Sequence, residues 1–263
     1  MEDARLGQKL VGYQEIRCDM IFYINMDGRF TRKACYVASG HTTDPSSSIT
    51  YYSVVPRDST RIAFTLLSLN SVEIRAADIG NAYLNAKCRE NIWTVAGTEF
   101  GSEKDKVDLV VSSLYGLKSF GAAWRQMLDQ TLRDLGYVSS KADPDVWLKD
   151  ETKPDGTEYY EYVLVYVDDV LHLHHDPKTF MNRLAEVYRL KDGSVGEPDG
   201  YHGANIEKVQ LGDGSVACSV TSREYVTNSI QNLEDTLSRD GAQPSMIFGN
   251  GLSPAFFPNI IDG

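Results

Sequence analysis

The sequence predicts an α+β fold in which helices back a mostly antiparallel sheet. Apolar residues alternate in several short segments, which is typical of strands, and recur at three and four positions in others, which is typical of helices. Two strand-like segments, 163–167 and 170–173, are separated by only two residues and predict a hairpin. A hairpin disfavours a doubly wound α/β fold, whose neighbouring strands are parallel.

Length and composition indicate a globular chain. With 263 residues, of which 42% are hydrophobic, it can bury one sizeable core or two modest ones. No segment approaches the roughly 18 uninterrupted apolar residues of a membrane span, and the N-terminus lacks the order of a signal peptide. We therefore expect an intracellular protein with no membrane partner. The four cysteines lack metal-binding spacing and are expected to be reduced.

The charge balance is acidic, with 26 Lys and Arg against 37 Asp and Glu and a formal net charge of -11. Such a charge opposes general attraction to a polyanion and so argues against nucleic-acid binding. A polymerase would need only a local basic track, because bound metal ions rather than side chains offset its catalytic carboxylates.

A helix and a strand are expected in the first third of the chain. Asp58 or Ser59 can cap the helix, whose apolar residues crowd one side before Asn70 ends it. From Val72 to Ile79 apolar residues alternate, which predicts a strand. This alternation places the carboxylate of Asp78 at the C-terminal end of that strand.

A second helix and the hairpin follow. Ser119 precedes the helix, and Gly136 stops it. Asp168 and Asp169 are expected at the hairpin tip, between strongly apolar strands. Because Asp is a favoured turn residue, about half of such isolated pairs would be turns without further function. The apolar stripe of the helix predicts core packing and comprises Trp124, Met127, Leu128, Leu132 and Leu135.

Two more helices are expected near the C-terminus. Asp176 would be the N-cap and Pro177 the first residue of a helix that continues toward Gly193. Another helix should begin near Ser222. Residues 1–20 and 240–263 lack periodicity and are expected to form tails.

Several motifs occur in a characteristic order. Asp78 begins the segment Asp78-Ile79-Gly80-Asn81-Ala82-Tyr83-Leu84, and Tyr166-Val167-Asp168-Asp169 follows later. Between them lie Leu114-Tyr115-Gly116-Leu117-Lys118, Ala122-Ala123-Trp124 and Asp143-Pro144-Asp145-Val146-Trp147. In order and spacing, from about residue 28 to 237, these motifs resemble the copia-type long-terminal-repeat retrotransposon reverse transcriptases.

The resemblance implies the fingers and palm of a polymerase, as a fragment of a Pol polyprotein. Residues 21–71 would form one portion of the fingers and residues 72–239 the palm, with a further fingers segment inserted at about 86–150. The ribonuclease H and integrase parts of such polyproteins would lie outside a chain of this length. Enzymes of this family act in cytoplasmic retrotransposon particles, so the same localisation is implied.

The resemblance also implies RNA-directed DNA synthesis. A primer 3′-hydroxyl on an RNA or DNA template would attack the α-phosphate of a deoxynucleoside triphosphate with two Mg²⁺ ions, or Mn²⁺, as cofactors. Asp78, Asp168 and Asp169 would be the catalytic, metal-binding carboxylates, and the carbonyl of Ile79 would add a ligand.

Basic residues near the N-terminus are expected to contact the triphosphate. The segment Arg32-Lys33-Ala34-Cys35-Tyr36-Val37-Ala38 resembles the fingers strand that presents them. Lys33 is the better candidate and Arg32 the second, although exposed basic residues on strands are more often solvated bystanders. The family commonly has arginine where Cys35 stands, which would fit a decayed copy.

Other residues match the nucleotide pocket and a general acid. Gly116, Lys118 and Ser119 lie in the segment that lines the pocket, but the family usually has glutamine where Ser119 stands. Tyr83 matches the residue whose ring excludes a ribose 2′-hydroxyl; a buried aromatic residue is an equal alternative. Lys191 matches the lysine that protonates the leaving pyrophosphate, and a lysine favoured by a helix C-terminus is at least an equal alternative.

Other functions stay open. A catalytically inert, truncated remnant would keep the fold as a binding module, which Cys35, Ser119 and the acidity favour and the intact aspartates oppose. A metal-dependent nucleotidyl transferase or nuclease would also cluster carboxylates, without needing Tyr83. We expect no metal site at His172 and His174, because neither a cysteine nor paired acidic spacing completes one.

Overall fold

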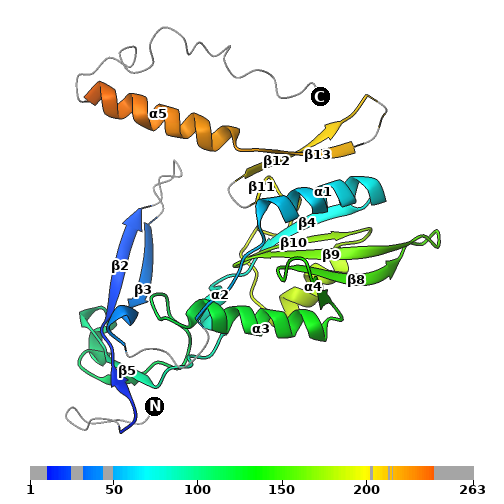
Figure 1. The fold of residues 1–263 in the computed structure, drawn as a ribbon. Coiled ribbons are helices and arrows are strands. Elements are labelled where there is room, and N and C mark those ends of the chain that lie inside the picture. Colours follow the sequence, from blue (N-terminus) through cyan, green and yellow to red (C-terminus); the bar gives the residue numbers. More distant parts are fainter. Residues whose placement is uncertain are drawn as a thin grey trace. The chain divides into compact units, whose positions relative to one another are not determined.

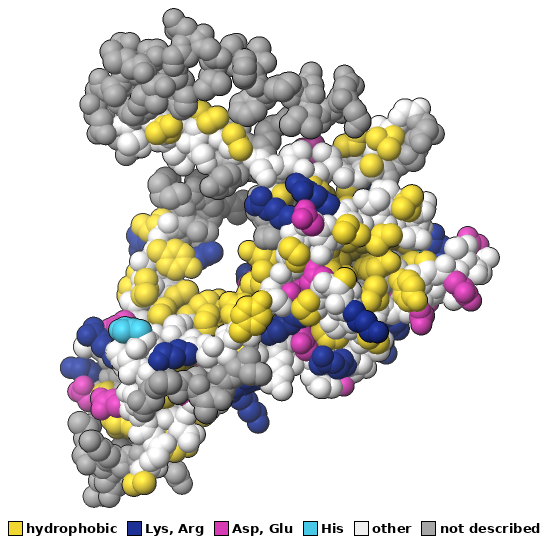
Figure 2. Space-filling view, in the orientation of Figure 1, with side chains coloured by type: hydrophobic (Ala, Val, Ile, Leu, Met, Phe, Trp, Pro, Cys, Tyr) yellow, Lys and Arg dark blue, Asp and Glu magenta, His cyan; other side chains and the backbone are white. Residues whose placement is uncertain are grey.

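The computed structural model describes residues 11–24, 32–43, 50–201, 204–212, 214 and 216–239. It confirms the mixed α+β class, with several mostly antiparallel sheets and helices (Figure 1). The chain forms two compact units, residues 1–197 and 198–263. Charged side chains of both signs are scattered over the face shown in Figure 2. The predicted tail at 240–263 lies outside the described residues.

A five-stranded antiparallel sheet organises the first unit, with the strand order β4-β10-β9-β8-β7. β9 and β10 form the predicted hairpin, and β4 pairs with the other side of β10. Because β10 lies between β4 and β9, the acidic residues of two separate motifs reach the same end of the sheet. The strands are β4 (Glu73–Asp78), β7 (Val138–Ser139), β8 (Val146–Thr152), β9 (Glu158–Tyr166) and β10 (Asp169–His174).

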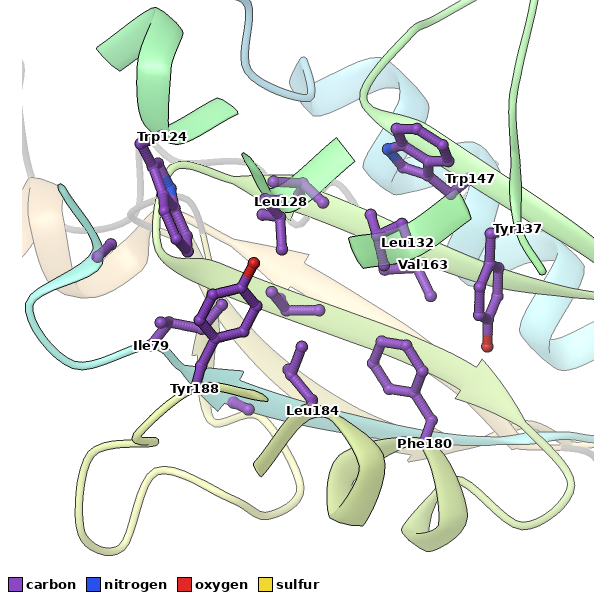
Figure 3. Packing of buried hydrophobic residues seen from close by; sticks show 14 of the residues in the cluster. Ile79, Trp124, Leu128, Leu132, Tyr137, Trp147, Val163, Phe180, Leu184 and Tyr188 are labelled. Carbon is purple, nitrogen blue, oxygen red and sulfur yellow. The ribbon is translucent and has the colours of Figure 1, made fainter. Parts of the chain in front are cut away.

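Helices cover both faces of this sheet (Figure 1). α3 (Phe120–Asp134) and α4 (Lys178–Val187) pack on one face through a buried hydrophobic cluster, and α1 (Arg57–Asn70) covers the other. The predicted stripe of α3 supplies Trp124, Leu128 and Leu132 to that cluster (Figure 3). α3 therefore has the boundaries and the buried face that the sequence predicts.

Two helix starts differ from the prediction. Pro56 is the N-cap of α1, and no side chain of the described residues caps this helix, so neither Asp58 nor Ser59 is its N-cap. Pro56 is extended and its carbonyl accepts the first helical hydrogen bond, which starts the helix earlier. α4 begins one residue after Pro177, and Asp176 Oδ1 accepts the N–H of the first helical residue at 3.4 Å. Asp176 thus satisfies a helix-end N–H from one residue before the observed N-cap, which is Pro177.

Two smaller sheets combine strands of the segments predicted to form fingers with residues 14–20, which were predicted to belong to a tail. β2 (Cys18–Ile24) and β3 (Arg32–Ala38) form an antiparallel hairpin. β1 (Gln14–Glu15) pairs in parallel with β5 (Ile92–Val95), which pairs antiparallel with β6 (Val107–Leu109). The N-terminal segment therefore contains strands although its sequence shows no periodicity. Short helices complete the unit: η1 (Gly40–Thr42), α2 (Ala82–Asn85) and η2 (Thr98–Glu103).

The second unit contains an antiparallel sheet and one helix. Its strands are β11 (Gly200–Tyr201), β12 (Ala204–Gln210) and β13 (Val216–Thr221), and α5 (Arg223–Arg239) begins where a helix was predicted. α5 contacts β12. Among the described residues, no helix is both long and apolar enough to cross a membrane.

Leu128→Ala is expected to lower the free energy of unfolding by about 2–5 kcal/mol, because it leaves a cavity among the residues under α3. Leu128 is 0% exposed, whereas Leu69 of α1 is 76% exposed. Leu69→Ala is the matched control and should change stability by about 0.5 kcal/mol or less. Urea denaturation followed by circular dichroism measures both, and equal losses would contradict the position of the core.

Candidate active site

A two-residue turn joins β9 to β10 and carries the first aspartate of the pair. The turn residues are Val167 and Asp168, and Asp169 is the first residue of β10. The prediction that both aspartates form the tip was therefore wrong by one residue. Val167 has a φ of 59°, so the turn has the left-handed backbone that two-residue hairpin loops favour. That conformation is rare for a β-branched residue.

The structure brings Asp78, Asp168 and Asp169 together. Asp169 lies opposite Asp78 in the pairing of β10 with β4. One residue further along, the backbone N–H of Ile79 donates to the carbonyl of Asp168 at 2.9 Å. The predicted catalytic residues thus share one end of the sheet, held there by backbone hydrogen bonds.

Lys191 joins this cluster from the segment after α4. Its Nζ lies 2.5 Å from Asp78 Oδ2 and 3.6 Å from Asp168 Oδ2. The Lys191 backbone N–H also donates to the Asp78 carbonyl at 2.9 Å, so the segment runs beside the end of β4. Because α4 ends at Val187, the alternative of a lysine at the helix end is wrong.

The cluster carries more negative charge than its surroundings offset. Burial, followed by the charges of Asp168 and Asp78, raises the pKa of Asp169 to about 6. Burial and Asp78 also raise the pKa of Asp168. Burial lowers the pKa of Lys191, but its hydrogen bond to Asp78 and the nearby carboxylates outweigh burial and raise it.

The donor set fits divalent cations. Asp78 Oδ1 is buried and has no hydrogen-bond partner within the described part of the chain, although a buried carboxylate oxygen normally has one. Carboxylate and carbonyl oxygens are the hard ligands that Mg²⁺ prefers, and Asp78, Asp168 and Asp169 supply them here. Burial and then neighbouring negative charge raise the pKa of Asp168 and Asp169, and a bound cation would offset that charge.

Tyr83 lies in α2, close to the carboxylates. Its ring is 6% exposed and lies 4.8 Å from the ring of Tyr115 and 4.5 Å from that of Phe120, between centroids. Burial, then a hydrogen bond with Tyr52, raises the pKa of Tyr83, and the charge of Asp168 adds to the effect. Tyr83 is therefore a packed aromatic residue that also borders the candidate site.

The predicted pocket residues Gly116, Lys118 and Ser119 have partners within the protein. Gly116 has a φ of 92° and approaches β3 so closely that a Cβ would overlap a backbone carbonyl. Lys118 Nζ donates to the carbonyl of Thr43 at 2.6 Å. Ser119 is buried, and its hydroxyl donates to Glu90 Oε2 at 2.7 Å. These contacts give each residue a structural role, and nucleotide binding stays a prediction for them.

The structure does not join Arg32 and Lys33 directly to the carboxylates in the part of the chain that it describes. Both are exposed on β3. Tyr115, which was not singled out from the sequence, connects the two regions. Its carbonyl accepts the N–H of Ala38 at the end of β3 at 2.8 Å. Burial and then the charge of Asp168 raise its pKa. In the sequence, its position within the motif predicted to line the nucleotide pocket was the available indication of this role.

Comparison with known proteins decides the family. Residues 21–246 match the family described as reverse transcriptase (RNA-dependent DNA polymerase). The chain belongs to this family. The resemblance to copia-type retrotransposon enzymes, first seen in the motifs, is thereby confirmed.

Three relatives of this chain are proteins of transposons. The chain is 30% identical over 188 residues to a retrovirus-related Pol polyprotein from transposon RE1 of Arabidopsis thaliana, covering 67% of this chain and 12% of that protein. It is 26% identical over 167 residues to the Pol polyprotein from transposon TNT 1-94 of Nicotiana tabacum, covering 61% of this chain and 12% of that protein. A transposon Ty5-1 protein of Saccharomyces cerevisiae is 26% identical over 162 residues, covering 60% of this chain and 49% of its own length.

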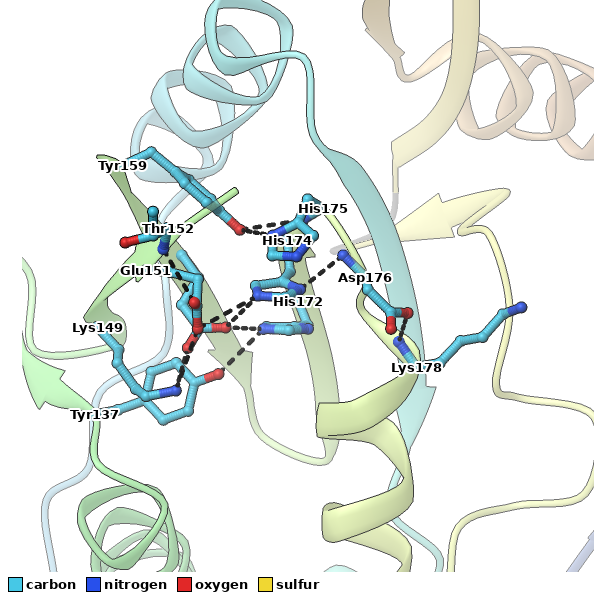
Figure 4. A network of polar contacts seen from close by, with 11 residues as sticks. Tyr137, Lys149, Glu151, Thr152, Tyr159, His172, His174, His175, Asp176 and Lys178 are labelled. Atoms are coloured by element: carbon cyan, nitrogen blue, oxygen red, sulfur yellow. Dashed lines mark hydrogen bonds and ion pairs between the residues drawn. The ribbon is translucent and has the colours of Figure 1, made fainter. Parts of the chain in front are cut away.

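A separate polar network of the reverse transcriptase chain lies at the other end of β10 (Figure 4). His172 Nε2 lies 2.9 Å from Glu161 Oε2 and 3.1 Å from Tyr137 Oη, and Lys149 Nζ donates to Glu161 Oε1 at 2.6 Å. Burial raises the pKa of Glu161, but the His172 and Lys149 hydrogen bonds outweigh it and lower that pKa to about 2. Burial lowers the pKa of His172. The network therefore holds a carboxylate beside a neutral imidazole.

In the folded structure, unlike in the sequence, carboxylates lie close to the histidines. Candidate ligand atoms of Glu151, Glu161 and His174 lie within 4.8 Å of one another, because β8 and β9 run beside β10. Sequence spacing missed this proximity. His174 Nδ1, however, accepts the backbone N–H of Asp176 at 2.7 Å, so neutral His174 carries its proton on Nε2. That nitrogen faces the carboxylates as a donor, which opposes metal binding.

Asp169→Asn is expected to raise the midpoint of thermal unfolding by a few degrees at pH 7 without divalent cations. The pKa of Asp169 is raised to about 6 in the folded protein. Its contribution to the free energy of unfolding is therefore complete below its unfolded-state pKa of about 3.9 and is lost as the pH rises through 6. The gain should therefore grow from about pH 4 to pH 7. Calorimetry in EDTA measures it, with Asp150→Asn, an exposed site on β8, as control. A variant less stable than its parent at pH 7 would contradict the crowding of charge.

Proposed function

We propose that this chain is the RNA-directed DNA polymerase part of a copia-type retrotransposon Pol protein. One observation carries the proposal: Asp78 and Asp169 face each other across two paired strands, with Asp168 in the adjoining turn, in a chain of the reverse transcriptase family. Template-directed nucleotidyl transfer needs such a set of carboxylates. The substrates would be deoxynucleoside triphosphates and a primer on an RNA or DNA template.

The residues of the cluster would have different roles in nucleotidyl transfer. Asp78, Asp168 and Asp169, with the Ile79 carbonyl, would hold two Mg²⁺ or Mn²⁺ ions. When bound, such ions supply Lewis-acid stabilisation to both the attacking and the leaving oxygen. Lys191 would keep a proton on Nζ beside the site, because its raised pKa favours the ammonium. It would exchange its contact with Asp78 for the leaving pyrophosphate and protonate it.

The arrangement of sheets supports the proposed division into subdomains in part, because β7 and the start of β8 lie in the inserted segment yet pair within the five-stranded sheet. The five-stranded sheet that holds the carboxylates would be the palm, within residues 72–239. The β2–β3 hairpin, which begins at Cys18 and lies mostly in residues 21–71, and the β5–β6 strands, in the inserted segment at about 86–150, would be fingers. Ribonuclease H and integrase parts of the same polyprotein, and a cytoplasmic retrotransposon particle, are further proposals that rest on the kinship with Pol polyproteins.

A net charge of -11 opposes general attraction to nucleic acid, so a local group of basic side chains would have to bind it. On the face shown in Figure 2, lysine and arginine side chains lie among acidic and apolar ones. Arg32 and Lys33 are exposed on β3 and are the residues that we propose for the triphosphate. Binding to template and primer should accordingly be sensitive to salt.

The purified chain is expected to incorporate deoxynucleotides on a poly-rA template with an oligo-dT primer and Mg²⁺ or Mn²⁺. The Asp168→Asn, Asp169→Asn variant should fall to background, because it removes two metal ligands. An Asp150→Asn, Asp155→Asn variant, changed at two exposed sites, is the matched control and should keep its activity. A folded parent chain without incorporation would favour the inert remnant.

Tyr83→Val is expected to raise ribonucleotide relative to deoxynucleotide incorporation by about 10- to 100-fold, because the ring would no longer exclude the 2′-hydroxyl. Tyr83→Phe keeps the ring and should change this ratio by less than about threefold. The ratio of kcat/KM for the two nucleotides measures the effect. An unchanged ratio in a folded, active Tyr83→Val variant would favour the alternative of a packing residue.

A further inference from the structure

A tryptophan from α3 holds the turn that carries Asp168. The indole N–H of Trp124 donates to the carbonyl of Val167 at 2.8 Å. Trp124 is 2% exposed and packs edge-on against Tyr188, with ring centroids 5.3 Å apart (Figure 3). The hydroxyls of Tyr188 and Thr131 are in turn 2.6 Å apart, so the indole has little freedom to move.

The turn needs such a contact because its backbone is unfavourable. Val167 adopts a φ of 59°, which a β-branched residue rarely takes unless its surroundings impose it. The next carbonyl, that of Asp168, accepts the N–H of Ile79 at 2.9 Å. Two successive carbonyls of the turn thus accept hydrogen bonds from two different elements, one from α3 and one from the end of β4.

We propose that Trp124 is a positioning residue for the metal-binding cluster. Its N–H fixes Val167 in the left-handed conformation and so aims the carboxylate of Asp168 at the side of Asp78 and Lys191. The inference rests on the proposed function, because it assigns Trp124 to the site through which metal ions would act. Residues that orient ligands in this way commonly change metal affinity without touching the ion.

A second buried tryptophan provides the comparison. Trp147 of β8 is 0% exposed and belongs to the same hydrophobic cluster as Trp124. Its Nε1 has no hydrogen-bond partner among the described residues. Replacing either indole by phenylalanine removes similar apolar area, but only at position 124 does it remove a hydrogen bond to the turn. The pair therefore separates packing from positioning.

The test measures Mn²⁺ binding by calorimetry in the parent chain, Trp124→Phe and Trp147→Phe, with Asp168→Asn to identify the site. Trp124→Phe should weaken Mn²⁺ binding by about 10- to 100-fold. Trp147→Phe should leave it within about twofold, even where it lowers the unfolding midpoint as much. Equal Mn²⁺ affinities in the two tryptophan variants would overturn the inference, as would a parent chain that binds no Mn²⁺.

Activity gives an independent readout. In an active chain, Trp124→Phe should raise the Mg²⁺ concentration for half-maximal synthesis, whereas a packing defect would lower activity equally at every Mg²⁺ concentration. A parent that binds Mn²⁺ but makes no DNA would contradict the proposed function and leave the Mn²⁺ comparison valid. If Trp124→Phe does not fold, Trp124→benzothienylalanine keeps the two-ring shape and replaces only the N–H by sulfur. Unchanged Mn²⁺ affinity in that variant would overturn the inference.

Discussion

The pairing of β10 with β4 is the constraint on which the candidate site depends. It sets Asp169 opposite Asp78 and lets the Ile79 N–H reach the Asp168 carbonyl. A shift of one residue would turn every side chain of β10 to the other face of the sheet and would separate the carboxylates. Because helices cover both faces, such a shift would also force buried side chains of β10 into packing formed around other residues, so the core helps to hold the register that the chemistry requires.

The carboxylate cluster opposes the stability that this core provides. Burial and mutual repulsion raise the pKa of Asp168 and Asp169, and Lys191 offsets only part of the charge. The turn adds the left-handed backbone of Val167. Such features persist where the surrounding packing over-determines them, and they concentrate at functional sites. The contacts of α3, including the indole of Trp124, supply that packing here.

The family motifs in this chain contain residues of the candidate site and also residues that pack inside the protein. Gly116 permits close approach to β3, and Ser119 binds Glu90 inside the protein. In the Asp143–Trp147 motif, Asp145 is buried in an ion pair with Arg125. Trp147 of the same motif belongs to the hydrophobic core. A motif match therefore identifies the family without assigning a catalytic role to each residue, and the departure at Ser119 has a structural explanation in its partner.

The sequence by itself determined the α+β class, the β9–β10 hairpin, α3, the start of α5 and the three candidate aspartates. Periodicity and short motifs are local properties, so they predict elements well. The ends of the elements were predicted less well: α1 starts after Pro56, and the hairpin turn begins at Val167. The backbone conformation at such a boundary depends on contacts with neighbouring segments. Only the tertiary structure decided that Lys191 meets Asp78 and that Glu161 meets His172. These contacts join separate segments through strand pairing and packing, which no local pattern encodes.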